Sequence, residues 1–177
     1  MEPQRQEDRA TSLLRARGMM RLSEFLNKIS RRQPFPGWSV VCYDSALAFH
    51  ELTDHIPRSV WMAIGPRDWR SKITSPRIEI VRFGPKEFDK GVEHHTIEGV
   101  PVPIYTPAKT IIDLFKGGQR PKAFHNAPAG IAHATQAMKD ALRLHKATPS
   151  EIAEYAVDAG IWQKIVQPRF ETLTIDA

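Results

Sequence analysis

The segment TPAKTIIDLF, residues 106–115, places Lys109 and Asp113 four residues apart in an otherwise apolar stretch. In a helix, residues at this spacing share a face, so the ammonium and the carboxylate should meet. Such a pair has two uses: Asp113 could act as a general base in a cleft, or the two charges could hold a helix in a core. An exposed pair contributes only about 0.2–1 kcal/mol, and the adjacent Ile111 and Ile112 favour burial. We therefore favour the structural use over catalysis.

The other reactive side chains lack the spacing of a metal, cofactor or nucleophile site. No P-loop, GxGxxG, HExxH or paired CxxC motif occurs in the chain. The adjacent His94 and His95 should point to opposite faces of a strand, whereas Glu93 and His95 can share one face. The single cysteine, Cys42, excludes an internal disulfide and is expected to be a small buried hydrophobic residue. We expect no catalytic residue, no metal and no cofactor.

Basic residues are concentrated near the N-terminus. Residues 1–32 hold eight of the 25 lysines and arginines but only four acids, and so carry +4 of the net charge of +5. This is either the footprint of a nucleic-acid contact or a solvated arginine-rich helix. A second basic segment surrounds Trp69, whose ring could stack on bases or tuck onto the body of the protein. The candidate nucleic-acid-binding residues are Arg15, Arg17, Arg21, Lys28, Arg31, Arg32, Arg67, Arg70 and Lys72.

The elements that must position these residues begin with a short helical region. Residues 7–17 and a segment capped by Ser23 predict two helices separated by Gly18, as at the start of a helix-turn-helix unit. The breaker segment SRRQPFPG, residues 30–37, predicts a linker. We therefore divide the chain into residues 1–36, a shortened helix-turn-helix-like region with its linker, and residues 37–177, the main domain.

The main domain opens with predicted strands. Asp44 is expected to cap a helix that follows the first strand. The turn signal Glu98-Gly99 predicts a hairpin over residues 92–105. Pro101 and Pro103 remove donors from one side of its second strand, which predicts an edge strand. The other predicted strands are residues 39–43, 59–64 and 77–83.

The second half of the main domain is predicted to be helical. Thr106 and Pro107 supply an N-cap and a first-turn proline for a helix over 108–115. Thr148 and Glu151 form a capping box for another helix. Further expectations are a loop over 116–130, a helix over 131–147 with Leu144 on its apolar face, and a last helix that Pro168 kinks or ends. Strands followed by helices indicate an α+β domain with a small mixed or antiparallel sheet.

Five segments in this order resemble the C-terminal domain of the AbiEi-type antitoxins, the regulator half of bacterial abortive-infection toxin–antitoxin pairs. They are DSALAFHELTDHIPRSVWMAI, RIEIVRF, GVEHHTIEGVPVPIYTPAKTIIDLF, MKDALRLHKATPSEIAEYA and IVQPRFETL. The resemblance runs from about Val40 to Leu173 and is most specific over Ser45–Pro57 and Pro107–Asp113. Its motif residues are His50, Thr53, Asp54, Pro57, Lys109, Thr110 and Asp113.

The resemblance implies a non-enzymatic, cytoplasmic antitoxin and transcriptional regulator. Such proteins carry an N-terminal winged-helix domain that represses their own operon, and they counteract a nucleotidyltransferase-like toxin without a stable complex. Here residues 8–29 resemble the first two helices of that domain, and Ser30–Trp38 stand where the recognition helix and wing should follow, so the domain is shortened. The loop over 116–130 is also longer than is usual in the family.

Two alternatives from other classes stay open. One is a nucleic-acid-processing enzyme that uses Lys109, Asp113 and the basic loop, and the other is a protein-interaction module without DNA binding. A nuclease-like cluster could draw on Asp44, Asp54, Glu79 and Asp113, although no spacing requires it. No apolar run approaches the roughly 18 residues of a membrane span, so we expect no membrane contact.

The charge distribution leads to a first prediction about DNA. Because the N-terminal region is basic but lacks the segment expected to read bases, binding should be weak, directed to phosphates and steeply dependent on salt. Sequence preference should be slight. A gel-shift titration with operator and scrambled DNA at several salt concentrations measures this. Nanomolar, promoter-selective binding at physiological salt would contradict it and restore a full repressor.

Overall fold

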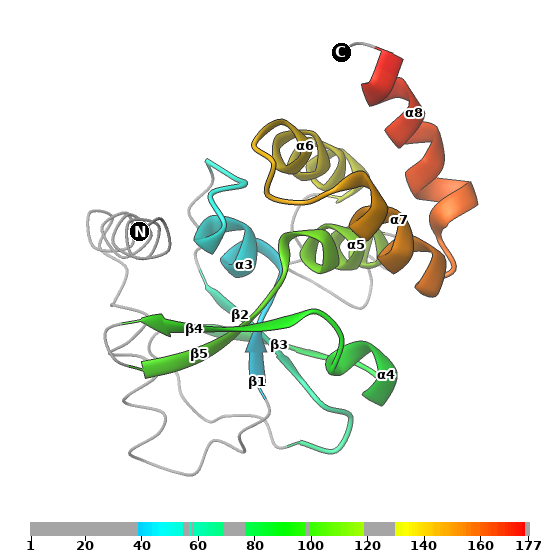
Figure 1. Ribbon diagram of the computed structural model, residues 1–177. Coiled ribbons are helices and arrows are strands. Elements are labelled where there is room, and N and C mark those ends of the chain that lie inside the picture. Colours follow the sequence, from blue (N-terminus) through cyan, green and yellow to red (C-terminus); the bar gives the residue numbers. More distant parts are fainter. Residues whose placement is uncertain are drawn as a thin grey trace. The chain divides into compact units, whose positions relative to one another are not determined.

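The chain has an α+β fold in which the strands precede the main run of helices, as predicted (Figure 1). The computed structural model describes residues 39–54, 57, 59–68, 77–97, 100–118 and 130–175. They belong to two compact units, of which the first ends at Tyr105 and the second begins at Thr106. The predicted N-terminal helices and the proposed boundary after residue 36 lie outside the described residues. No described helix has both the length and the apolar character needed to cross a membrane.

The first unit is built on a mixed sheet of five strands. Its elements are β1 (Ser39–Val41), α3 (Tyr43–Phe49), β2 (Val60–Ile64), β3 (Ile78–Arg82), α4 (Pro85–Phe88), β4 (Val92–Ile97) and β5 (Val100–Tyr105). The strand order is β3-β2-β1-β5-β4. The β1–β2 and β4–β5 pairs are antiparallel, and the β2–β3 and β1–β5 pairs are parallel. Strands β1 and β2 are buried along their whole length, in keeping with sequences that are apolar except for Ser39.

The predicted hairpin is confirmed, but the prediction that its proline-containing strand is an edge is wrong. Strand β5 lies between β1 and β4, so β4 is the edge. The β4–β5 ladder is continuous and pairs His94 with Pro103 and Thr96 with Pro101. The donors that the prolines lack therefore belong to the side that faces β1. There the register pairs Val41 with Ile104, beyond both prolines, so the missing donors are compatible with an interior strand.

Helix α3 begins two residues earlier than predicted, and Asp44 is not its cap. The N-cap is Cys42, without a side-chain cap, and Asp44 lies in the first turn. The chain enters the helix at Tyr43, whose φ of 46° is unusual for a bulky residue. The Tyr43 ring makes edge contacts with Trp61 and Phe83 at centroid distances of 5.6 and 6.2 Å. These aromatic contacts explain why the turn into the helix occurs at this residue.

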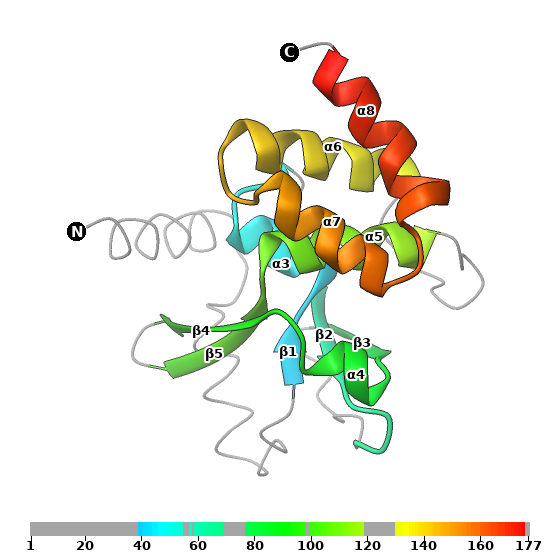
Figure 2. The ribbon, with the colours of Figure 1, turned by 45° about the vertical axis from the view of Figure 1, so that its right-hand side comes forward.

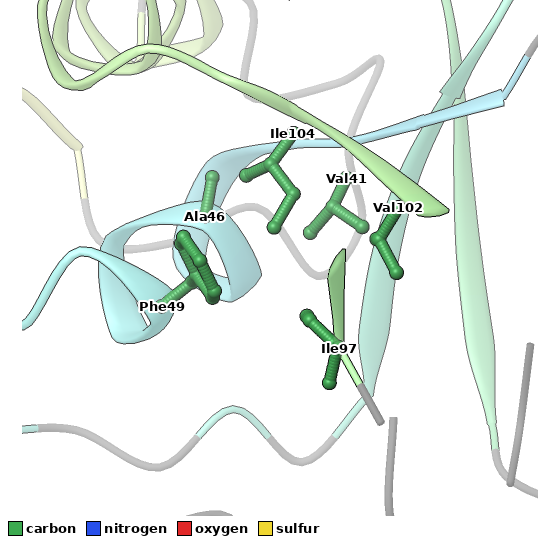
Figure 3. Packing of buried hydrophobic residues seen from close by; sticks show 6 residues of the cluster. All are labelled: Val41, Ala46, Phe49, Ile97, Val102 and Ile104. Carbon is green, nitrogen blue, oxygen red and sulfur yellow. The ribbon is translucent and has the colours of Figure 1, made fainter. Parts of the chain in front are cut away.

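Helix α3 packs its apolar side on the sheet. Figure 3 shows the cluster formed by Ala46 and Phe49 of α3 with Val41, Ile97, Val102 and Ile104 of the sheet. A polar contact holds the start of the helix: Ser45 Oγ accepts a hydrogen bond from the Trp61 amide at 2.9 Å. The Trp61 carbonyl in turn accepts from the Cys42 amide at 3.1 Å. The helix is thus attached to β2 directly beyond the end of the β1–β2 ladder.

The second unit is helical. It contains α5 (Pro107–Gly118), α6 (Gly130–Arg143), α7 (Pro149–Asp158), the π-helix η1 (Trp162–Val166) and α8 (Gln167–Ile175). Helix α5 packs against α6 and α7, as Figure 2 shows. The predicted loop over 116–130 is wrong at both ends, because α5 continues to Gly118 and α6 begins at Gly130. The intervening residues 119–129 lie outside the described residues.

Two further helix predictions are corrected. Helix α6 ends at Arg143, and Leu144, expected on the apolar face, is 42% exposed because it follows the last helical residue. His145, with a φ of 53°, turns the chain away from the helix axis. Of the two outcomes expected at Pro168, an end of the helix does not occur. Pro168 lies in the first turn of α8, which follows η1 directly, and the change from π-helix to α-helix occurs just before it.

The predicted capping box of α7 is confirmed and leads to a stability prediction. Glu151 N donates to Thr148 Oγ1 at 3.2 Å, and Thr148 N donates to Glu151 Oε2 at 2.7 Å. Thr148→Ala should lower the free energy of unfolding by about 0.5–2 kcal/mol in urea denaturation. Thr148→Ser, which keeps the hydroxyl oxygen, is the control, and an equal loss in both variants would contradict the role of the cap.

The same box should make stability depend on pH. Hydrogen bonds from the Thr148 backbone and then from its side chain lower the pKa of Glu151 below its ordinary value of 4.5. A lowered pKa in the folded state stabilises the fold above the unfolded value, and this contribution is lost as the pH falls through the folded pKa. The stability difference between the natural chain and Glu151→Gln should therefore be largest near neutral pH and shrink below about pH 4.5.

Candidate functional site: a buried lysine–aspartate pair and a histidine anchor

Helix α5 places the Lys109–Asp113 pair on consecutive turns. The Lys109 amide donates to Thr106 Oγ1 at 3.3 Å, so Thr106 caps the helix as predicted, and Pro107 is the first helical residue. The helix is apolar around the pair, with the fully buried side chains Ile111, Ile112 and Phe115 among its residues. Burial of these side chains brings the two charges out of water with them.

The two charges hold each other closely. Lys109 Nζ donates to both carboxylate oxygens of Asp113, at 2.6 Å to Oδ1 and 2.5 Å to Oδ2. Each side chain is only 6% exposed, and Thr110 between them in sequence is fully buried. Among the described residues, no buried side-chain nitrogen or oxygen lacks a hydrogen-bond partner. The site is therefore a nearly buried ion pair in close contact, which the i,i+4 spacing correctly predicted.

This geometry determines what the pair can do chemically. A carboxylate acts as a general base when an oxygen can reach a substrate proton or a bridging water. Both Asp113 oxygens instead accept from the same ammonium, and the side chain is nearly inaccessible to solvent. Removing two charges from water carries a large desolvation penalty that their attraction offsets only in good geometry. The pair thus holds the Lys109 and Asp113 side chains against each other on one face of α5.

His50 is another buried polar side chain among the motif residues. It caps the C-terminus of α3, and its Nε2 lies 2.8 Å from the Tyr105 carbonyl oxygen. A carbonyl can only accept, so Nε2 carries the proton. Tyr105, buried as well, donates its hydroxyl to the Phe88 carbonyl at 2.9 Å. The histidine therefore anchors the end of α3 to the end of β5 within the first unit.

Sequence reasoning did not identify the Tyr105 contacts. The only signal was a lone tyrosine at the end of an apolar strand, and a buried tyrosine hydroxyl ordinarily finds a partner. The remaining motif residues of the Ser45–Pro57 segment differ in exposure: Thr53 is half-buried, Asp54 is exposed and Pro57 is buried.

Of the nine candidate nucleic-acid-binding residues, only Arg67 belongs to the described residues, and it is exposed. The other eight lie outside them: Arg15, Arg17, Arg21, Lys28, Arg31, Arg32, Arg70 and Lys72. The turn that carries Arg67 is well defined. Asp68 Oδ2 accepts from the Gly65 amide at 2.7 Å, and Arg82 donates to the carbonyls of Gly65 and Pro66 at 3.1 and 3.2 Å. Arg67 therefore projects from a turn braced by its neighbours.

Glu93 and His95 share a face of β4, as predicted, and they are in contact. His95 Nε2 lies 3.0 Å from Glu93 Oε2 on the exposed part of β4, and the His95 ring packs 4.7 Å from that of Phe49. Across the described ranges, no three His, Cys, Asp or Glu side chains are arranged to hold a metal ion. Of the acids considered for a nuclease-like cluster, Glu79 accepts from Arg77 at 2.8 Å, and Asp113 accepts from Lys109. Cys42 is fully buried, as predicted.

No protein-family model matches the chain, and no curated protein matches it.

The geometry of the ion pair predicts a characteristic double-mutant cycle. Lys109→Met and Asp113→Leu should each lower the free energy of unfolding by about 3–5 kcal/mol, because each leaves an uncompensated buried charge. The double variant should recover most of this loss, since two apolar side chains of similar volume replace the pair. Urea denaturation of the four proteins measures the coupling. Single variants that each cost less than about 0.5 kcal/mol, a typical surface value, would contradict the structural role.

Proposed function

We propose that this protein is an AbiEi-like antitoxin and transcriptional regulator that acts in the bacterial cytoplasm without catalysing a reaction. In this proposal, residues 37–177 counteract a nucleotidyltransferase-like toxin, functionally rather than through a stable complex. Residues 1–36 contribute a weak, phosphate-directed DNA contact. The proposal starts from the ordered set of five sequence segments that resemble the C-terminal domain of this family.

The observation that carries the proposal is that polar side chains are buried and hydrogen-bonded in the two segments where the family resemblance is most specific. His50, from the Ser45–Pro57 segment, donates to a backbone carbonyl 55 residues away. Lys109 and Asp113, from the Pro107–Asp113 segment, satisfy each other inside the second unit. Catalytic groups must reach a substrate, whereas residues that position a scaffold are buried and partnered. These contacts support a binding protein over an enzyme.

The proposed DNA contact rests on charge. The six candidate basic residues before residue 33 are part of a region that carries most of the net positive charge of the chain. Exposed Arg67 can add to this field. Cations that contact phosphates attract any DNA and position a protein on it, but they do not read sequence. Regulation by such a region would act through proximity to the operator rather than through tight, selective binding.

If the protein were instead an enzyme that uses Asp113, the Lys109–Asp113 pair would have to open. For Asp113 to act on a nucleic acid, one carboxylate oxygen would have to leave Lys109 Nζ and reach solvent or a metal ion. An assay with single-stranded and double-stranded DNA and RNA, with and without Mg²⁺, separates the alternatives. Cleavage by the natural chain that disappears in Asp113→Asn, with the fold intact, would assign an enzyme and overturn the proposal.

The division of labour within the chain leads to a prediction in cells. The protein is co-expressed with the nucleotidyltransferase-like toxin expected from the neighbouring reading frame, and growth is the readout. Replacing the six basic residues Arg15, Arg17, Arg21, Lys28, Arg31 and Arg32 by Gln should abolish most of the DNA affinity, because it removes six positive charges. Relief of growth arrest should persist. Residues 37–177 alone should also relieve arrest.

Circular dichroism and urea denaturation confirm that each variant is folded before growth is compared. A folded residue 37–177 fragment that fails where the full chain succeeds would show that the N-terminal region belongs to the antitoxin mechanism. A full chain that fails to relieve arrest by the neighbouring toxin would overturn the antitoxin proposal itself. A toxin inactivated by a substitution in its own active site serves as the control for nonspecific effects on growth.

A further inference from the structure

Strand β4 is an edge strand of the sheet that the described residues form. It is the terminal strand in the order β3-β2-β1-β5-β4, and no described strand pairs with its outer side. Its residues Glu93, His94 and Thr96 are exposed. Natural edge strands are commonly protected from pairing by charged side chains, especially lysine, by proline or by a bulge. Strand β4 has the sequence VEHHTI: Glu93 is its one acidic residue, it has no lysine or proline, and its register with β5 is unbroken.

The prolines of β5 determine which β4 groups point outward. In an antiparallel ladder, residues alternate between pairs that exchange hydrogen bonds and pairs that do not. Pro101 and Pro103 have no N–H to donate, so their partners Thr96 and His94 occupy the non-bonded positions. Residues at these positions direct both their N–H and their C=O away from β5. Val92, two residues before His94, points the same way, so three residues offer donors and acceptors at the edge.

We propose that two copies of this chain pair through β4, antiparallel and centred on His94, to form one continuous sheet. In this register His94 lies opposite His94 of the second copy, and Val92 lies opposite Thr96. These pairings join only residues whose backbone groups point outward, as the ladder requires. A shift by one residue would pair outward groups with groups already used by β5, so the parity of the prolines excludes it.

A register centred on His95 would also satisfy the backbone, and the side chains favour the register centred on His94 over it. On the face that carries Ile97, Glu93 of one copy comes opposite His95 of the other, and the reverse. The Glu93–His95 hydrogen bond at 3.0 Å within each copy thus gains a second pair across the axis. Centring on His95 would instead place His95 opposite itself and Glu93 opposite Ile97. Complementary cross-strand pairs are favoured over mismatched ones. Because an identical strand supplies these complementary pairs, we assign a second copy of the chain as the partner of this edge.

Cysteine cross-linking tests the register in the full chain. Opposed residues in a hydrogen-bonded antiparallel pair have Cα atoms about 5.5 Å apart, within the range of a disulfide. His94→Cys should therefore form a covalent dimer on mild oxidation, seen on non-reducing gels. Thr96→Cys is the matched control: its counterpart lies opposite residue 92, so it should not cross-link. The native Cys42 is fully buried and does not compete. Cross-linking of Thr96→Cys or of His95→Cys instead of His94→Cys would overturn this register.

Solution mass tests the association itself. The 20.1 kDa chain should sediment at about twice its mass at high concentration. Thr96→Pro removes an outward donor that β5 does not use, and His94→Lys places two cations opposite each other, so each should raise the dimer dissociation constant at least about tenfold. Thr96→Ala keeps the donor and should weaken the dimer far less than Thr96→Pro. Val157→Lys, at a 60% exposed position on α7, should leave it unchanged.

Several outcomes would overturn the proposal. A natural chain that stays monomeric up to about 1 mM has no such association. If Val157→Lys dissociates the dimer and His94→Lys leaves it intact, the dimer forms through another face. A monomeric chain whose complex with the co-expressed toxin is lost in His94→Lys would assign the edge to a different protein. The mass measurement does not involve DNA or toxin, so its failure leaves the proposed function untouched.

Discussion

The hydrogen bond from His50 Nε2 to the Tyr105 carbonyl completes the first unit of the chain. Strand β5 joins the β4–β5 hairpin to the rest of the sheet, and its register with β1 pairs Val41 with Ile104. Two prolines limit how far that ladder can run. The histidine compensates by attaching the end of α3 to the last residue of β5, where the Tyr105 hydroxyl also holds the Phe88 carbonyl. A short ladder is thereby reinforced by side chains at its C-terminal end.

The second unit also contains buried polar groups that are held by a partner, and here the partners are charged. A lysine and an aspartate that are both buried must satisfy each other, since either one alone would be strongly disfavoured away from water. Helix α5 provides the spacing, and both carboxylate oxygens are occupied by one ammonium. The two segments of highest sequence specificity therefore contain polar groups that act inward.

Two exposed features of the first unit carry the proposals made here. One is the turn after β2, where Asp68 and Arg82 fix the backbone and Arg67 stays exposed. The other is the outer edge of β4, where backbone donors and acceptors alternate with side chains of both polarities. A charged turn attracts a polyanion without demanding a geometry, whereas a strand edge demands one register. The two surfaces are thus suited to different partners.

The sequence by itself determined the features that depend on residues a few positions apart. These are the Thr106 cap, the Thr148–Glu151 box, the Lys109–Asp113 contact and the register of the hairpin. Each follows from backbone geometry over one turn of helix or one tight turn, so local spacing is sufficient to predict it. The assignment of strands before helices, and so the α+β class, came from the same local periodicities.

Only the tertiary structure decided the order of the strands and the partners of the buried polar groups. Pro101 and Pro103 predicted an edge, yet β5 is interior, because the lost donors matter only where a neighbouring strand would use them. Asp44 was the better cap by residue type, but the packing of the Tyr43 ring on Trp61 and Phe83 moved the start of the helix. His50 could not be matched to Tyr105 from spacing, since 55 residues separate them. Such choices depend on which distant surfaces meet, and that is settled by the burial of the whole core rather than by any segment alone.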